Sequence, residues 1–264
     1  MPDTATPFEE IIYEVDGHIA TITLNAPDRL NTISGPMLDA LSEALLKADK
    51  DKNVRCVILT GAGRAFCAGL NLQTATTGSG AVESAHLDLR NTPPTILFNM
   101  DTPTICAVNG GAAGYGMDTA LGCDIRIMSD KAKMAAAFTK RGILPESGGT
   151  WFLPRLLGWE KACELIFTGR TLKADQCLAE GLCVKVVPHE TLMDEARALA
   201  AEIAANAPMA VQASKRLMRM GLSEPFTEHV HHVFLQLLPL IKSDDAREGM
   251  MAFLEKREAK FTGK

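Results

Sequence analysis

The residues of this chain that could do chemistry gather in three glycine-bearing turns, at positions 61–72 (GAGRAFCAGLNL), 108–118 (VNGGAAGYGMD) and 142–150 (GILPESGGT). The middle turn carries four glycines between positions 110 and 116, directly ahead of an apolar segment. Backbone N–H groups left free at such a helix N-terminus stabilise negative charge. On spacing alone, each turn could also be an ordinary strand-to-helix connection, for which glycine is the default residue.

Two carboxylates, Asp118 and Glu146, accompany the second and third turns. Asp118 falls in the first turn of the expected helix, where an acid also suits the helix dipole. Glu146 follows Pro145, and an exposed loop glutamate would fit that position equally well. Their separation, 146 − 118 = 28 positions, does not show whether they meet. The sequence has neither a Walker loop nor a GxSxG nucleophile motif, so these two acids are not accompanied by a recognisable phosphate-binding or nucleophile motif.

Three closely spaced histidines, His229, His231 and His232, resemble a fragment of a metal site. They have no cysteine nearby and no HExxH context, and closely spaced metal ligands usually bring more partners than these. We therefore predict no metal site.

The elements that must position these turns alternate between strands and helices in the first part of the chain. Residues 18–25 (HIATITLN) alternate as a strand does, and residues 37–50 form an amphipathic helix preceded by Ser34 as a cap and Pro36 in its first turn. Residues 54–60 predict a buried strand, so a right-handed crossover unit is expected. Further strands are expected at 104–109, 124–128, 134–137 and 184–187, with a short helix ending at 121.

The rest of the chain reads as a long loop and a helical tail. Residues 74–94 are rich in Thr, Ser, Gly and Pro and predict a loop, with a short helix around 82–90. Helices are expected at 191–205, 209–220, 225–240 and 244–258. The pattern as a whole is that of an α/β protein.

Composition excludes several classes. The 264 residues include 27 Lys and Arg against 32 Asp and Glu, a net charge of −5, and only 5% aromatics. That balance disfavours nucleic-acid binding. No apolar run is long enough to span a membrane, and no secretory signal is visible at the start. The seven cysteines lie mostly in apolar runs without a CxxC pair, so we expect reduced thiols and a cytoplasmic location.

Taken together in this order, the three turns identify a resemblance. The chain resembles the enoyl-CoA hydratase/isomerase (crotonase) family over nearly its full length, through TGAGRAFCAGLNL, PTICAVNGGAAGYGMDTALGCDIRI and GILPESGGTWFLPRLLG. The resemblance implies a crotonase-like ββα spiral core over residues 1–200. It also implies a helical C-terminal region over residues 201–264 that forms homotrimers or dimers of trimers. The implied substrate is an acyl-CoA thioester, with no cofactor beyond the CoA that it carries.

The resemblance also implies which residues form the site. The backbone N–H groups of Leu70 and Tyr115 would hold the thioester oxygen. The family usually has glycine at the place of Tyr115, so the ring of this residue would reshape the acyl pocket. Phe253 and Lys256 would reach the CoA of a neighbouring subunit. The full implied CoA- and substrate-binding set is Arg29, Asn31, Ala65, Ala68, Gly69, Asn71, Leu72, Gly114, Phe138, Phe253 and Lys256.

The acids divide the family by reaction. Its hydratases carry two glutamates, at the places of Asp118 and Phe138, and phenylalanine cannot move protons. Glu146 matches the place where members that shift double bonds carry an acid, and PESGGTWFLPR resembles the ring-epoxide isomerases of the phenylacetate pathway, which have aspartate there. We therefore predict double-bond isomerisation with Glu146 as the general base and Asp118 assisting or orienting a water. The alternatives are an enoyl-CoA hydratase using Asp118 and Glu146, or a non-catalytic protein that binds CoA thioesters.

Overall fold

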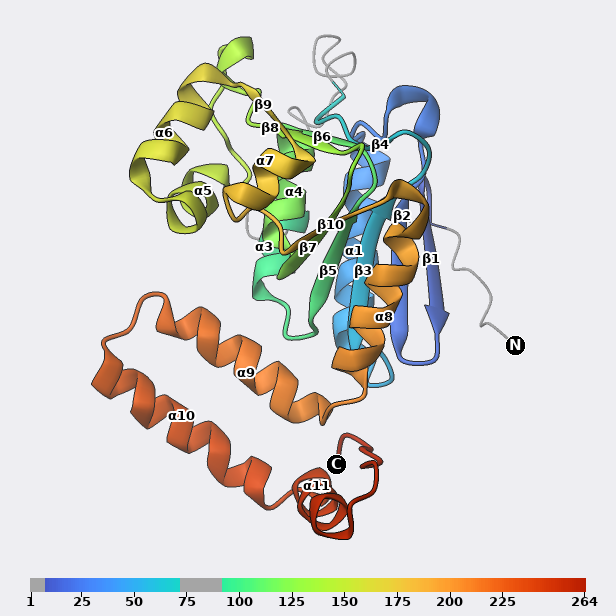
Figure 1. Cartoon of the computed structure of the whole chain (residues 1–264), viewed down its shortest axis with the longest axis vertical. Helices are drawn as coiled ribbons and strands as arrows, with labels where there is room; N and C mark the ends of the chain where they lie inside the picture. Colours follow the sequence, from blue (N-terminus) through green and yellow to red (C-terminus); the bar gives the residue numbers. More distant parts are fainter. Residues whose placement is uncertain (1–7, 72–91) are drawn as a thin grey trace.

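The computed structural model describes residues 8–71 and 92–264 (Figure 1). Leu72 and most of the predicted 74–94 loop, including its expected short helix, lie outside the described residues. The last residues of that predicted loop are helical instead, because α3 runs over Pro93–Asn99 with both of its prolines in the first turn, where proline is well tolerated.

Two sheets form the framework. The larger has six strands in the order β1-β2-β3-β5-β7-β10, in which β1 and β2 pair antiparallel and the other neighbours pair parallel. The smaller has four strands in the order β4-β6-β8-β9. The strands are β1 Ile11–Asp16, β2 Ile19–Leu24, β3 Cys56–Gly61, β4 Ala65–Cys67, β5 Thr104–Val108, β6 Gly111–Ala113, β7 Ile125–Ser129, β8 Lys133–Ala135, β9 Thr171–Lys173 and β10 Lys185–Val187.

A strand–strand–helix repeat relates the two sheets. In each of the pairs β3/β4, β5/β6 and β7/β8, the first strand joins the larger sheet and the second joins the smaller one. This repeat is the ββα spiral that the family resemblance implies. The helices are α1 Gly35–Lys50, α3 Pro93–Asn99, α4 Tyr115–Gly122, α5 Gly149–Leu157, α6 Trp159–Thr168, α7 Ala174–Ala179, α8 Leu192–Ala204, α9 Pro208–Gly221, α10 Phe226–Ile241 and α11 Asp244–Glu255.

The longer predicted helices and strands are confirmed, and most of the strands that the sequence did not predict are only three residues long. Ser34 caps α1 as expected, because its side chain accepts a hydrogen bond from the Met37 amide. Strands β4, β6 and β9 have three residues each, too few for an alternation to be visible. Strand β1 was also missed, although Ile11 and Tyr13 alternate with exposed residues and face the core.

Helix α8 closes the core on the larger sheet, packing against β3, β5 and β7 (Figure 1). Ala196 and Ala200 of α8 are fully buried against Ile58 and Ile105 of the sheet. The predicted boundary at residue 200 between the core and the C-terminal region falls inside α8. This boundary remains a prediction.

Helices α9, α10 and α11 extend away from the two sheets (Figure 1). Helix α9 is fastened at two places: Arg216 and Arg219 both contact Asp101 in the segment after α3, and Lys215 pairs at 2.8 Å with Asp124, which directly precedes β7. None of the described helices is long and apolar enough to cross a membrane. All seven cysteines fall within the described ranges and none is in a disulfide.

Candidate active site

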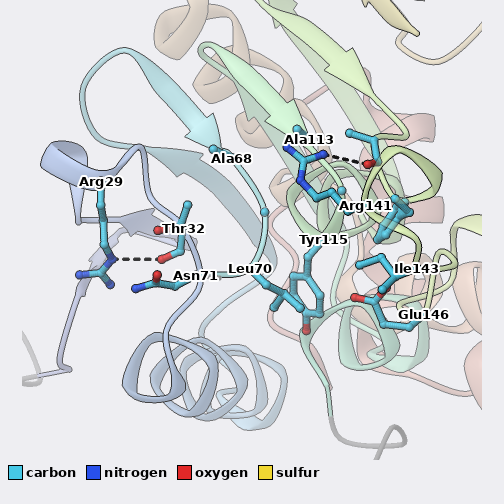
Figure 2. Close-up of a pocket in the computed structure, with 14 residues that line it drawn as sticks. Arg29, Thr32, Ala68, Leu70, Asn71, Ala113, Tyr115, Arg141, Ile143 and Glu146 are labelled. Atoms are coloured by element: carbon cyan, nitrogen blue, oxygen red, sulfur yellow. Dashed lines mark hydrogen bonds between the residues drawn. The ribbon is translucent and has the colours of Figure 1, made fainter. Parts of the chain in front are cut away.

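A cavity of about 350 Å³ opens where the first two glycine turns meet the third (Figure 2). It contains residues from the ends of β4 and β6, the start of α4 and the turn before α5. Its lining consists of Arg29, Thr32, Ala68, Gly69, Leu70, Asn71, Ala113, Gly114, Tyr115, Ala137, Phe138, Arg141, Ile143 and Glu146.

The backbone of Leu70 presents one N–H group to this cavity. Ile33 binds the residues on either side of Leu70, donating to the Gly69 carbonyl at 2.8 Å and accepting from the Asn71 amide at 2.9 Å. Because successive peptide groups in extended backbone point in opposite directions, the N–H of Leu70 faces away from Ile33.

Tyr115 presents a second N–H group. It is the first residue of α4, so its amide has no carbonyl one helical turn earlier to bind. The two turns touch: a Cβ placed on Gly69 would lie 3.1 Å from the Ala113 carbonyl oxygen and 4.0 Å from the Tyr115 nitrogen. The amides of Leu70 and Tyr115 therefore lie on neighbouring stretches of backbone lining one cavity, as an anion site requires.

Two glycines allow this close approach. Gly114 has a φ of 54°, a conformation that residues with side chains rarely adopt. A Cβ on Gly116 would lie 2.2 Å from the carbonyl oxygen of Cys67, so any side chain there would push α4 away from β4. The glycines of the second turn thus fix the separation of the two amides.

Glu146 provides the carboxylate of the cavity, and Figure 2 shows its side chain beside Ile143 and Tyr115. It follows Pro145, which is buried and anchors the turn, whereas Glu146 itself remains accessible from solvent. Partial burial of the carboxyl group raises its pKa above the ordinary value. A carboxylate of raised basicity next to two free amides is placed to take a proton.

Asp118, which we predicted to assist Glu146 or orient a water, lies outside the cavity lining. It is 1% exposed. Its Oδ2 accepts hydrogen bonds from the Ser147 hydroxyl at 2.7 Å and from the Gly149 amide at 3.0 Å. Asp118 therefore holds the turn that carries Glu146 instead of facing a substrate or a water in the cavity.

Burial dominates the electrostatics of Asp118. Desolvation, with a smaller contribution from the charge of Glu146, raises its pKa to about 7 against the opposing effect of the Ser147 and Gly149 donors. Its Oδ1 has no hydrogen-bond partner among the described residues, and a Cβ on Gly149 would lie 2.5 Å from that oxygen. A residue with a side chain at position 149 would therefore collide with the Asp118 carboxyl group.

Two aromatic side chains shape the cavity. Phe138 lines it, with its ring 3.8 Å from where a Cβ on Gly114 would stand. The ring of Tyr115 lies between Leu70 and Glu146, as Figure 2 shows. Its hydroxyl is buried close to Thr92 and makes no hydrogen bond of ordinary geometry to the described residues, and burial raises its pKa.

Two arginines line the mouth of the cavity. Arg29 pairs with Glu10 at 2.5 Å and donates to the Thr32 carbonyl at 3.2 Å. Arg141 donates to the Ala137 carbonyl at 2.8 Å and is exposed. We did not predict Arg141, although its position one residue before the third turn was a usable signal.

Several predicted binding residues lie elsewhere. The Asn31 side chain is fully buried and braces the turns, donating to the Ala62 and Ala65 carbonyls at 2.9 Å each. Ala65 is buried in β4 and is not part of the cavity lining. Phe253 belongs to α11 and Lys256 caps its C-terminal end, and α11 lies far from the strands β4 and β6 (Figure 1). Within one chain, none of these four contacts the cavity.

The histidine cluster also has an ordinary explanation. The Nδ1 atoms of His229 and His232 lie 3.2 and 3.0 Å from the same carboxylate oxygen of Glu224. Within residues 8–71 and 92–264, no group of three or more His, Cys, Asp or Glu side chains is placed to hold a metal ion.

Two backbone amides and a carboxylate thus line one cavity in a spiral of ββα units, an arrangement with the groups needed to stabilise an oxyanion while a base moves a proton. The sequence profile of the enoyl-CoA hydratase/isomerase family matches residues 14–264. The chain belongs to this family and has its crotonase-like fold, and it is an enzyme of the isomerase or lyase type that acts on CoA thioesters.

Individual relatives carry names from both reaction types. The chain is 37% identical to the 1,2-epoxyphenylacetyl-CoA isomerase of Escherichia coli, covering 97% of this chain and 99% of that one. It is 34% identical to the short-chain-enoyl-CoA hydratase of Clostridium acetobutylicum, covering 94% and 95%. The crystal structure of an enoyl-CoA hydratase from Bacillus anthracis superposes with a TM-score of 0.91 at 33% identity, covering 97% of this chain and 100% of that one. The non-catalytic alternative is therefore set aside, whereas the choice between isomerisation and hydration depends on the site.

Proposed function

We propose that the protein moves a double bond along the acyl group of a CoA thioester, with Glu146 as the general base. The observation that carries the proposal is the placement of the two acids. Among the described residues that line the cavity, Glu146 is the only carboxylate. Asp118 is buried outside the lining, and its carboxylate accepts hydrogen bonds from Ser147 and Gly149.

The proposed reaction begins with a 3-enoyl-CoA whose thioester oxygen binds the amides of Leu70 and Tyr115. Glu146 removes a proton from C2, and the electron pair moves into the carbonyl to form a dienolate. The same carboxyl group then returns the proton at C4, which leaves the double bond between C2 and C3. One proton leaves and one returns, so the step needs no cofactor beyond the CoA of the substrate.

The two amides supply the stabilisation that this intermediate needs. Negative charge develops on the thioester oxygen, and preorganised donors oppose it without reorganisation. Each such donor contributes about 2.7–4 kcal/mol in comparable sites. The raised pKa of Glu146 matches the same step, because a more basic carboxylate removes a weakly acidic proton more readily.

Hydration of a 2-enoyl-CoA is the second candidate, and the presence of hydratases among the relatives favours it. That reaction needs two groups, one to activate the water and one to protonate carbon. In the described structure Phe138 stands at one of the expected acid positions, and Asp118 is turned away from the cavity. These placements support isomerisation over hydration.

The cations at the mouth fit the CoA part of the substrate. We propose that Arg29 and Arg141 bind its phosphates, because both line the cavity and both are accessible to solvent, Arg29 partly and Arg141 more fully. Guanidinium groups bind phosphate oxygens through charge-assisted hydrogen bonds. Ala68, Gly69 and Asn71 would contribute the backbone next to the thioester.

We also propose that the chain forms a homotrimer or a dimer of trimers through its C-terminal helices. Helix α10 is rich in apolar residues, yet none of its side chains is buried in the single chain. Phe253 is 84% exposed. In such an assembly Phe253 and Lys256 would reach the CoA of a neighbouring subunit. Sedimentation velocity tests this, and a monomer at micromolar concentration would contradict it.

Isotope incorporation tests the reaction itself. The protein is incubated in deuterated water with a 3-enoyl-CoA and, separately, with a 2-enoyl-CoA, and the products are followed by mass spectrometry and ultraviolet absorption. Isomerisation predicts bond migration with deuterium incorporation and no addition of water. A product heavier by one water, formed from the 2-enoyl-CoA as the main reaction, would contradict the proposal.

A further inference from the structure

A second cavity, of about 320 Å³, lies on the other side of Glu146. It is formed between α3 and the start of α5. Its lining consists of Thr92, Pro94, Thr95, Phe98, Glu146, Ser147, Gly148, Trp151 and Phe152. Glu146 is the residue that the two linings share, so its side chain lies between the amides of the first cavity and the interior of the second.

Three aromatic rings form the wall of this second cavity. The ring centroids of Phe98 and Trp151 are 4.9 Å apart, those of Trp151 and Phe152 are 5.2 Å apart, and those of Phe98 and Phe152 are 5.8 Å apart. All three pairs meet edge to face, the arrangement that the ring quadrupoles favour. Aromatic residues make up only 5% of the chain, so three of them in the lining of one cavity is a marked local enrichment.

The backbone around these rings is held at both ends. The carbonyl of Phe98 accepts a hydrogen bond at 3.0 Å from Arg219 of α9. The amides of Trp151 and Phe152 bind the Gly148 carbonyl at 2.8 and 2.9 Å. The cavity wall is therefore part of the folded framework, and the rings are presented at fixed positions.

Apart from Glu146, the described lining carries no charged side chain. Its polar side-chain groups are three hydroxyls and the indole N–H of Trp151. The Ser147 hydroxyl donates to Asp118, and the hydroxyls of Thr92 and Thr95 lie 3.2 Å apart. The Arg155 guanidinium, which is not part of the described lining, lies over the Trp151 ring, 4.0 Å from its centroid. Such a cavity suits a flat apolar group and offers little to a charged one.

We propose that the second cavity holds an aromatic ring at the far end of the acyl group, so that the preferred substrates are aryl-ended enoyl-CoA thioesters. The inference rests on the proposed function, which puts the thioester at the Leu70 and Tyr115 amides and the reacting carbons at Glu146. The acyl chain then runs past Glu146 into the aromatic wall. A cavity of about 150 Å³ is enough to bind benzene, so the available volume accommodates a phenyl ring.

Edge-to-face contacts distinguish an aryl group from an alkyl group of equal size. They add about 0.5–1.5 kcal/mol beyond the area buried, which corresponds to a preference of about 2- to 13-fold. A matched set of substrates isolates this effect: 5-phenylpent-3-enoyl-CoA, 5-cyclohexylpent-3-enoyl-CoA and undec-3-enoyl-CoA have the same number of acyl carbons. In each, a methylene separates the double bond from the tail, so the chemistry at the reacting carbons is the same.

The wild-type enzyme is expected to turn over the phenyl substrate with a kcat/KM about 3- to 10-fold above that of the cyclohexyl substrate. Phe98→Leu and Trp151→Leu should each reduce this ratio towards one. Phe8→Leu, which changes a ring packed on Tyr13 outside both cavities, should leave it unchanged. A wild-type preference for the straight chain, or equal losses on all three substrates in both cavity variants, would overturn the proposal.

A binding measurement separates this proposal from the proposed reaction. The saturated esters 5-phenylpentanoyl-CoA and 5-cyclohexylpentanoyl-CoA cannot undergo bond migration, and their affinities are measured by titration calorimetry. If no substrate isomerises but the phenyl ester binds 3- to 10-fold more tightly in a manner that depends on Phe98 and Trp151, the reaction is wrong and the aryl site stands. If the two esters bind equally, the aryl site is wrong whatever the reaction.

Discussion

Asp118 offers the sharpest perturbation, because a catalytic acid and a structural acceptor predict opposite results for one substitution. Asp118→Asn keeps an oxygen that can accept from Ser147 and Gly149, whereas Asp118→Ala removes it. If Asp118 only positions the turn of Glu146, the Asn variant should retain kcat within about threefold. A general acid or base contributes about 10²- to 10⁴-fold, so loss of that role would be unmistakable.

The Ala variant leaves two donors without a partner in a buried site. Each unpaired buried donor costs about 1–3 kcal/mol, so the free energy of unfolding should fall by about 2–6 kcal/mol. The turn would also be less well held, and misplacement of a catalytic group by 1 Å can cost about 10²-fold in rate. We therefore expect the Ala variant, and not the Asn variant, to lose both stability and kcat.

The pH dependence of stability adds an independent readout. The pKa of Asp118 is raised from 3.8 to about 7, so the folded state holds this proton more tightly than the unfolded state does. The stability associated with it is complete below pH 4 and is lost as the pH rises through about 7. The amide side chain introduced by Asp118→Asn cannot titrate, so the stability of this variant does not change with pH through this group. The free energy of unfolding of Asp118→Asn, relative to that of wild type, should therefore rise by up to about 4 kcal/mol between pH 4 and pH 7 and then level off.

The assays are bond migration monitored by ultraviolet absorption and chemical denaturation at pH 4–9. The reasoning fails if Asp118→Asn unfolds at the same denaturant concentration as wild type at pH 7, yet loses more than about 100-fold in kcat. That result would place Asp118 among the groups that move protons and would favour the hydratase alternative.

Three other predictions follow from the same structure. Because burial raises the pKa of Glu146 and the base must be ionised, kcat/KM should rise with pH through an inflection above 4.5, which a pH–rate profile measures; an inflection at or below 4.5 would contradict it. Gly116→Ala should lower kcat by about 10²-fold, because the added Cβ would lie 2.2 Å from the Cys67 carbonyl oxygen and would separate the two amides. The control is Gly35→Ala, whose added Cβ would have no atom within 4 Å, and it should match wild type in the same kinetic assay. Arg126→Met should lower the free energy of unfolding by about 3 kcal/mol in urea titrations. The reason is that Arg126 donates two hydrogen bonds of 2.7 Å, one to the Cys123 carbonyl at the end of α4 and one to the Leu182 carbonyl. Unchanged stability would contradict that role.

The sequence was informative where a pattern extended over many residues or a turn had one physical explanation. The helix capped by Ser34, the alternating strand β2 and the free amides of the glycine turns were all predictable from local rules. The three-residue strands were not, because their pairing is decided by neighbours distant in the sequence.

The role of Asp118 could not be read from spacing. Its side chain is directed by contacts with Ser147 and Gly149, which lie about thirty positions further along the chain. The bracing contacts of Asn31 could not be predicted for a similar reason, since a buried amide that braces two turns and a binding amide look alike in sequence. The second cavity was also missed, because Phe98 and Trp151 come from separate helices and neither belongs to a motif.

The account depends most directly on Glu146 as the group that moves the proton. The decisive measurement is exchange of the C2 proton of a 3-enoyl-CoA in deuterated water, followed by mass spectrometry for wild type and for Glu146→Gln. We predict that exchange and bond migration both fall by at least about 10²-fold in the variant, while the affinity for the CoA ester changes less than threefold. Full exchange by Glu146→Gln would contradict the account.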